Sequence, residues 1–219
     1  MKKIKPKVMV AVPCMEKIDW ETVLALFNLP RGTKNAEVHF VPHSGSLVYN
    51  ARNIFCNTAV QEDYDYIMFI DSDMIFPANV IDKLLALDAD VATAVCYGRA
   101  GNHNPQVYVE MQPATKDNPN TVSRRPDSVE GVFEIRACGM ACCLVGVGLI
   151  KEMQSRGINP FEPFGNLGED FSFCVRAQAL GAEMYADGTI PIYHKGVAYY
   201  GKEHWVKDPP PPSCEDEKK

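Results

Sequence analysis

Short apolar runs alternate with segments of helical periodicity over the first hundred residues. We predict strands at Val8–Val12, at Ala36–Val41, within Tyr66–Pro77 and at Asp90–Cys96, and helices at Asp19–Leu29, Leu47–Gln61 and Pro77–Leu87. The strands are apolar throughout, as in sheets that are buried on both faces. The pattern therefore predicts an α/β fold, with a mainly parallel sheet flanked by helices and the first run as a central strand.

Helical spacing also predicts which side chains face the core. They are Trp20, Val23, Leu24 and Phe27 in the first helix, and Ala51, Ile54, Phe55, Thr58 and Ala59 in the second. Ser44 or Ser46 is expected to cap the start of the second helix, because their hydroxyls can accept a bond from a free amide.

The pattern changes after Gly98. Residues Gly98–Gly131 are rich in Asn, Pro, Gly and charge, with one short strand at Gln106–Met111, and we expect a mobile flap beside the functional site. Core composition returns at Val132–Val147, followed by helices at Gly148–Arg156 and after Gly168, a strand at Glu183–Asp187 and a last apolar piece at Ile190–Gly196. The chain is expected to form a single domain over residues 1–206, with a Pro-rich, charged, flexible tail over 207–219.

The most unusual feature is Asp71-Ser72-Asp73 at the end of a strongly apolar strand. Two carboxylates next to a buried segment are costly unless a cation meets them. Open α/β sheets bind their ligands at the carboxyl ends of the strands, so this pair predicts a metal-binding Asp-x-Asp motif.

Three further groups of residues have both a functional and a structural interpretation. Arg52, near the start of a helix, either contacts a diphosphate together with Asn53 or forms a surface ion pair. Asp170, in Gly168-Glu169-Asp170, is either a base in a cleft or a common first-turn acid. His194 is either a functional imidazole or a structural one. Arg124 and Arg125 could likewise reach a phosphate or simply be solvated.

Composition narrows the function classes. The formal charge of −6 and the lack of a dense Lys/Arg cluster argue against nucleic acid as a partner. The eight cysteines form no Cys-x-x-Cys pair, and we interpret Cys138, Cys142 and Cys143 as core residues rather than a zinc site. The basic N-terminus is followed by too short an apolar run for a signal peptide, and no run is long enough to span a bilayer, so a cytoplasmic location is expected.

Taken in order, the motifs VMVAVP, NARN, FIDSDMIF, GEDFSFCVRAQALG and YHKG resemble GT-A fold glycosyltransferases, particularly the family 2-like branch. The resemblance extends to about Gly196. It implies a Rossmann-like GT-A domain with a DxD motif that binds a nucleotide-diphosphate sugar through Pro13, Arg52, Asp71 and Asp73.

The resemblance also implies roles for single residues. Asp73 and His194, and more weakly Asp71, would hold Mn²⁺ or Mg²⁺ between the two phosphates, or Asp71 would contact the ribose. Asp170 would accept the proton of the acceptor hydroxyl and give inversion, although retaining enzymes share the same fold. The expected activity is the non-processive transfer of one sugar to an acceptor that is soluble or carried on a protein.

The sequence departs from the family pattern in two places. Cys14-Met15-Glu16 follows the first strand where a Tyr-Asn-Glu type turn is usual, and no Asp after the second strand is placed to read a base. The nucleotide therefore stays open. Two alternatives also remain: a nucleotidyltransferase of the same fold, which usually carries a Gly-rich basic loop after the first strand, and a non-catalytic module that binds a nucleotide sugar or a metal.

Overall fold

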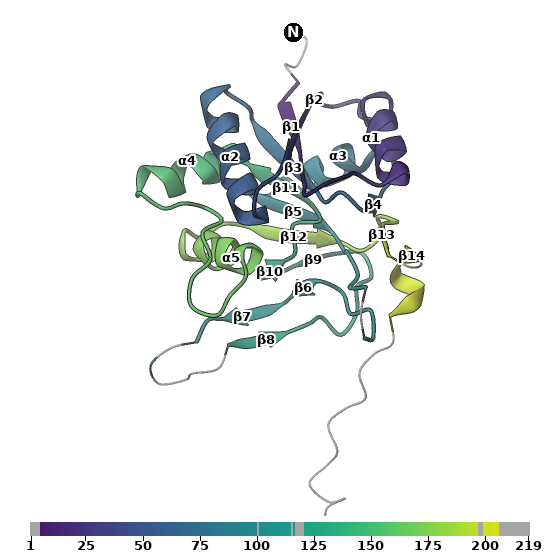
Figure 1. The fold of residues 1–219 in the computed structure, drawn as a ribbon. Helices are drawn as coiled ribbons and strands as arrows, with labels where there is room; N and C mark the ends of the chain where they lie inside the picture. Colours follow the sequence, from purple (N-terminus) through teal and green to yellow (C-terminus); the bar gives the residue numbers. More distant parts are fainter. Residues whose placement is uncertain (1–4, 100, 115, 117–120, 197–198, 206–219) are drawn as a thin grey trace, which may run out of the picture.

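The computed structural model describes residues 5–99, 101–114, 116, 121–196 and 199–205. Its centre is a seven-stranded sheet in the order β2-β1-β3-β11-β5-β12-β9 (Figure 1). The strands are β1 (Lys7–Cys14), β2 (Glu37–Ser44), β3 (Tyr66–Ile70), β5 (Val91–Ala94), β9 (Val132–Glu134), β11 (Cys142–Gly146) and β12 (Met184–Asp187).

The sheet is mixed but largely parallel. β1 runs parallel to β2 and β3, and β12 runs parallel to β5, whereas β11 and β9 run antiparallel to their neighbours. This confirms the α/β class with a mainly parallel sheet. One detail of the prediction was wrong: β1 lies next to the edge strand β2, and the middle of the sheet is β11, from the apolar segment Val132–Val147.

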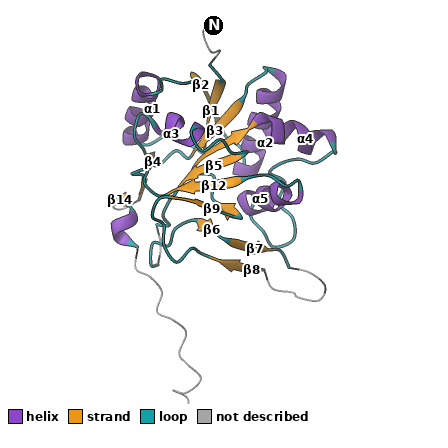
Figure 2. Ribbon diagram, turned by 180° about the vertical axis from the view of Figure 1, so that it is seen from behind, coloured by secondary structure: helices purple, strands orange, loops and turns teal. Residues whose placement is uncertain are grey.

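Helices cover both faces of the sheet (Figures 1 and 2). They are α1 (Trp20–Gly32), α2 (Val48–Gln61), α3 (Val80–Leu85), α4 (Val147–Ser155) and α5 (Glu169–Ala179). One core cluster joins the sheet to α2, α4 and α5, and a second joins the opposite face to α1 and α3. The two layers explain why the strands are apolar on both sides.

The buried face of α1 is not the predicted one. The helix turns Thr22, Ala25, Leu26 and Leu29 to the sheet. Trp20, Val23, Leu24 and Phe27, the predicted core face, are exposed. Both sets have helical spacing, so periodicity alone could not choose between them.

The second helix also differs in detail. Ala51, Phe55 and Ala59 are buried as predicted, but Ile54 is exposed and Arg52 takes a buried position instead. Neither predicted serine caps the helix: Leu47 is the N-cap residue, and it makes no side-chain capping bond.

The segment predicted as a flap contains short strands. β6 (Val107–Tyr108) pairs with β10 (Ala137–Cys138), and β7 (Glu110–Gln112) pairs with β8 (Val122–Arg124). Arg125 donates from Nε to the carbonyl oxygen of Pro105 and from Nη2 to the Tyr108 hydroxyl, and Arg124 lies 3.6 Å from Glu110. These arginines are therefore bound within the segment and do not reach toward Asp71 or Asp73. Parts of the expected flap, residues 100, 115 and 117–120, lie outside the described residues.

A small three-stranded sheet follows the Asp-x-Asp turn. It consists of β4 (Met74–Ile75), β13 (Tyr193–Lys195) and β14 (Tyr199–Tyr200), followed by the 3-10 turn Lys202–His204. The predicted tail at 207–219 lies outside the described residues. Within the described part of the chain, no helix has the length and apolar character needed to cross a membrane.

The cysteines of the described residues are free thiols, and six of the seven are buried. Cys138 and Cys143 belong to the core cluster on one face of the sheet, and Cys142 belongs to the cluster on the other face. Neighbouring strand residues point to opposite faces, so the three thiols cannot converge on one zinc ion. The interpretation of these cysteines as core residues is confirmed.

Candidate functional site

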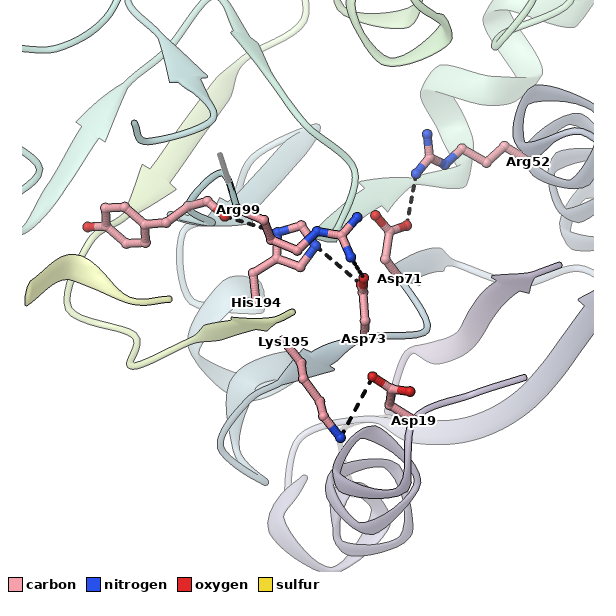
Figure 3. A network of polar contacts seen from close by, with 8 residues as sticks. Asp19, Arg52, Asp71, Asp73, Arg99, His194 and Lys195 are labelled. Carbon is pink, nitrogen blue, oxygen red and sulfur yellow. Dashed lines mark hydrogen bonds and ion pairs between the residues drawn. The ribbon is translucent and has the colours of Figure 1, made fainter. Parts of the chain in front are cut away.

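Asp71, Ser72 and Asp73 form the turn between β3 and β4, at the carboxyl ends of the parallel strands (Figure 3). The strand before the turn is buried from Ile67 to Ile70, so the two carboxylates emerge directly from the core. The side chains of Asp71 and Asp73 remain 32% and 21% exposed, which leaves both accessible to a ligand.

Strand pairing brings His194 to Asp73. β13 pairs antiparallel with β4, which aligns His194 with Met74, and the N–H of Lys195 donates to the carbonyl oxygen of Asp73 at 2.8 Å. His194 Nε2 then lies 3.3 Å from Asp73 Oδ1 (Figure 3). The two residues predicted to share a metal are therefore neighbours.

A backbone carbonyl fixes the imidazole of His194. Nδ1 lies 3.0 Å from the carbonyl oxygen of Tyr97, to which it can only donate. Nε2, which faces Asp73, is therefore the nitrogen free to lose its proton and coordinate a cation. Metal-binding histidines are commonly oriented in this way.

The pKa values of the pair move in opposite directions. Burial alone would lower the pKa of His194, but the hydrogen bond and charge of Asp73 raise it above its usual range. Burial alone would raise the pKa of Asp73, but the hydrogen bond and charge of His194 and the charge of Arg99 lower it. The two side chains therefore stabilise each other as an ion pair.

Arg99 is a second cationic partner of Asp73. Its Nη1 lies 2.8 Å from Asp73 Oδ2, and its side chain is 51% exposed. Arg99 follows β5, which ends at the same edge of the sheet as β3. Both oxygens of Asp73 thus have a positively polarised partner, and both partners favour the charged form of the carboxylate.

Arg52 joins the first aspartate of the motif to α5. Nη2 lies 3.0 Å from Asp71 Oδ1, and Nη1 lies 2.5 Å from Glu169 Oε1. The Arg52 side chain is only 4% exposed, and its Nε has no polar partner among the described residues. The structure therefore indicates a buried bridge between two carboxylates, whereas the sequence suggested either a diphosphate contact or a surface ion pair.

Asp170 lies beside this bridge, in the first turn of α5. The N–H of Phe171 donates to Asp170 Oδ1 at 2.8 Å. Burial, followed by the charge of Glu169, raises the pKa of Asp170, and the charge of Asp71 raises it further. A Cβ atom at Gly168 would lie 3.2 Å from Asp170 Oδ1, and one at Gly139 would lie 3.8 Å from Oδ2, so both glycines leave room around the carboxylate. A buried carboxylate of raised pKa is suited to exchange protons.

A cavity of about 360 Å³ opens next to the Asp-x-Asp turn, within the size range of small-molecule sites. Its lining residues are Pro13, Cys14, Met15, Glu16, Lys17, Ser46, Val48, Asp71, Ser72 and Asp73. Pro13, Asp71 and Asp73, three of the predicted contacts to the nucleotide, therefore share one cavity. Arg52 and His194 are connected to it through Asp71 and Asp73 respectively.

The donor set fits a divalent cation in part. Asp73 and His194 offer an oxygen and a nitrogen 3.3 Å apart, a combination suited to Mn²⁺. However, no three His, Cys, Asp or Glu side chains gather as a metal centre anywhere in the described ranges. A cation at Asp73 and His194 would therefore need further ligands from water or from a bound diphosphate.

Sequence reasoning missed several residues of the site. Two of them, Tyr97 and Arg99, come just after β5. A third, Lys195, is next to His194 in the sequence and pairs with Asp19 and Glu21. Glu169 was seen only as part of the motif around Asp170. The one usable signal for Arg99 was its position just beyond a predicted parallel strand, because such strands end at the same edge as Asp71.

The chain has no match among protein-family models and none among curated proteins. Its structure is similar to the structure described as "Crystal Structure of A197 from STIV", with a TM-score of 0.61, 17% sequence identity, and coverage of 87% of this chain and 86% of that one. At this identity the similarity concerns the fold alone. It supports the mixed α/β domain, and function has to be inferred from the site.

Proposed function

We propose that this protein is a metal-dependent glycosyltransferase of the GT-A type, which transfers one sugar from a nucleotide-diphosphate sugar to an acceptor hydroxyl with inversion. The observation that carries the proposal is the approach of His194 to Asp73, with Asp170 close enough to Asp71 for the two charges to interact. A cation-binding pair and a nearby base are the two parts that such a transfer requires.

The donor would bind in the cavity beside the Asp-x-Asp turn. Pro13 and Asp71 line that cavity, so a nucleoside there would lie against them. A cation at Asp73 and His194 would stabilise the negative charge that develops on the departing diphosphate. The exposed guanidinium of Arg99 is close enough to Asp73 to contact the same phosphates once it releases the carboxylate.

Asp170 would act as the base. Its raised pKa means that it holds a proton more tightly than an ordinary carboxylate, which favours proton transfer from a hydroxyl. The acceptor oxygen would form its bond to the anomeric carbon from the face opposite the diphosphate, and its proton would pass to Asp170. Arg52 would act indirectly, by holding the carboxylates of Asp71 and Glu169 in fixed positions.

The test is a panel of nucleotide-diphosphate sugars, each with and without Mn²⁺, with calorimetry for binding and release of nucleoside diphosphate for slow hydrolysis. We expect at least one donor to bind only with the metal and to be hydrolysed. If none of the donors binds in a metal-dependent manner, the transferase proposal is wrong.

The ion pair between Arg99 and Asp73 favours a second candidate, a non-catalytic protein that binds a nucleotide sugar and uses Arg99 where an enzyme uses a metal. In that case a donor would bind equally well in EDTA and would not be hydrolysed. The same panel therefore separates the two candidates.

A further inference from the structure

A second cavity, of about 310 Å³, lies at the carboxyl ends of β5 and β12. These two strands run parallel, and the carboxyl ends of parallel strands are where open α/β sheets bind their ligands. Four parts of the chain line the cavity: the residues just after β5, residues 188–193, Glu130, and the 3-10 turn Lys202–His204. The cavity therefore occupies a favourable place in the fold, apart from the one beside the Asp-x-Asp turn.

The wall formed by the turn after β12 is held by internal contacts. The N–H and the hydroxyl of Thr189 both donate to Asp187 Oδ1, at 2.8 and 2.7 Å. A Cβ atom at Gly188 would lie only 1.6 Å from the carbonyl oxygen of Val129, so only glycine allows the two segments to approach so closely. These contacts fix the wall of the cavity, as in the largely pre-formed sites that bind small molecules.

The hydroxyl of Tyr97 is the feature that points to a ligand. Tyr97 is only 3% exposed, and its carbonyl oxygen accepts the hydrogen bond from His194. Its hydroxyl, in contrast, has no hydrogen-bond partner among the described residues. The hydroxyl is not one of the fully enclosed unpaired atoms, so it reaches the cavity that Tyr97 lines. Because buried polar groups are almost always paired, this hydroxyl is a free contact for a ligand.

The charged groups around Tyr97 supply both donors and acceptors. Burial raises the pKa of the Tyr97 hydroxyl, and nearby ionisable groups, including Glu130 and Glu203, raise it further. The hydroxyl therefore keeps its proton and can donate it in a hydrogen bond. Lys202 forms an ion pair with Glu130, and the side chain of Glu203 is 57% exposed. A ligand in the cavity would thus meet a phenol, an ammonium group and two carboxylates.

This lining suits a neutral ring that carries several hydroxyl groups. The rings of Tyr97 and Tyr193 and the apolar residues 190–192 offer a surface on which the C–H face of a sugar can pack. The carboxylates can accept bonds from its hydroxyls. An anion would be repelled by the two carboxylates, and a cation would have to compete with Lys202 for Glu130. Charge therefore favours a neutral sugar over either kind of ion.

We propose that this cavity is a second ligand site, which binds a neutral sugar ring through a hydrogen bond from the Tyr97 hydroxyl. The site goes beyond the proposed transfer, because neither Asp73 nor Asp170 is among the described residues that line it. It is nonetheless adjacent to the cation pair. Tyr193 precedes His194 in β13, and neighbouring strand residues point to opposite sides, so the sugar would lie behind the strand that carries His194.

The test is a saturation-transfer NMR titration of the full chain with the methyl glycosides of glucose, galactose, mannose and N-acetylglucosamine, in EDTA and without a nucleotide sugar. We expect at least one glycoside to bind with a Kd of about 1 to 20 mM. Tyr97→Phe should weaken its binding by about three- to tenfold, because the variant loses one donor but keeps the ring and the carbonyl that holds His194. Tyr66→Phe, at the start of β3 and thus at the other end of the strands, is the matched control and should bind normally.

A second variant, Glu203→Gln, should weaken the binding by about threefold, because a neutral amide accepts a weaker hydrogen bond than a carboxylate. Circular dichroism checks that each variant is folded. If no glycoside binds at about 100 mM, or if Tyr97→Phe leaves the binding unchanged, the proposal is wrong. Choline and benzoate are tested in parallel, and Tyr97-dependent binding of either would show that the site takes an ion, which also overturns the proposal.

The outcome is separable from that of the proposed function. Binding of a glycoside in EDTA needs neither the cation nor the donor, so it can succeed when the nucleotide-sugar panel fails. Conversely, a negative result here leaves metal-dependent binding of a donor unaffected, because that binding is expected in the cavity of Asp71 and Asp73.

Discussion

His194 donates its Nδ1–H to the carbonyl oxygen of Tyr97 across 3.0 Å, and this single bond decides which nitrogen faces Asp73. The carbonyl belongs to the segment just after β5 and the histidine belongs to β13, so two distant parts of the chain set the tautomer. The fold therefore fixes the orientation of the imidazole, with Nε2 directed at Asp73.

Asp73→Ala and His194→Ala should each weaken Mn²⁺-dependent binding of a nucleotide sugar by about 100-fold or more, because each removes one of the two protein ligands that we propose for the cation. Calorimetry with and without EDTA measures the effect. Asp63→Asn is the control, since Asp63 is 90% exposed and its positive φ is one that asparagine tolerates. Unchanged metal-dependent binding in both alanine variants would place the cation elsewhere.

Arg99→Ala should bind Mn²⁺ more tightly than the wild type in the absence of nucleotide, by about three- to tenfold, because Arg99 competes for Asp73. Electron paramagnetic resonance of free Mn²⁺ measures this affinity directly. Arg124→Ala serves as the control, because Arg124 is similarly exposed and pairs with Glu110 in a separate sheet. A weaker affinity in Arg99→Ala would show that Arg99 supports the cation instead of competing with it.

Asp170→Asn should keep donor binding and lose transfer by about 10²- to 10⁴-fold, as expected when a general base is removed. The measurement is the rate of nucleoside diphosphate release with an acceptor, at a saturating concentration of donor. Full transfer activity in this variant would assign the base to another group or indicate a retaining mechanism.

Asp170→Asn should also change the pH dependence of stability. The pKa of Asp170 is raised in the folded protein, so the folded state binds a proton more tightly than the unfolded chain. The folded state therefore loses stability as the pH rises from the ordinary carboxyl pKa of the unfolded chain through the raised pKa of Asp170 in the folded protein. The variant should melt at a higher temperature than the wild type at pH 7, and the difference should vanish at the acid end of that window. Asp63→Asn, at a position that is 90% exposed, is the control for the substitution itself.

Arg52→Met should lower the free energy of unfolding by about 3 kcal/mol, because it leaves Asp71 and Glu169 without their shared partner. Urea unfolding measures the change. Arg156→Met is the control, since Arg156 is 58% exposed and its pair with Glu152 is expected to contribute less than about 1 kcal/mol. A loss for Arg52→Met no larger than that of the control would mean that the bridge does not stabilise the fold.

The sequence predicted the fold class and most elements, because buried parallel strands and intervening helices leave a clear pattern of apolar runs. It failed on α1, where two stripes of equal spacing compete and only the position of the sheet decides between them. Between Gly98 and Gly131 it predicted a single strand at Gln106–Met111, where the structure has β6 and β7, and it missed β8, because strands of two or three residues carry almost no periodicity.

The residues of the candidate site likewise include some that the sequence could predict and some that it could not. Asp71 and Asp73 could be predicted because carboxylates at the end of an apolar strand are unusual in themselves. The contacts of Arg99 with Asp73 and of Arg52 with Glu169 could not be predicted. Each contact depends on which strand ends and helix starts become neighbours in the folded protein. Glu169 and Arg52, for example, are far apart in the chain and meet only after α5 packs on the sheet.

The pairing of β13 with β4 has a consequence for the order in which the protein matures. All seven strands of the central sheet are complete by Asp187, whereas the histidine that would share a cation with Asp73 comes later, on a strand outside that sheet. A growing chain thus has all seven strands before His194 is made, while the core on one face still lacks Ile190 and Ile192. If the proposed cation pair is real, competence to bind the cation would arise only when β13 pairs with β4, after the chain of the central sheet has been made.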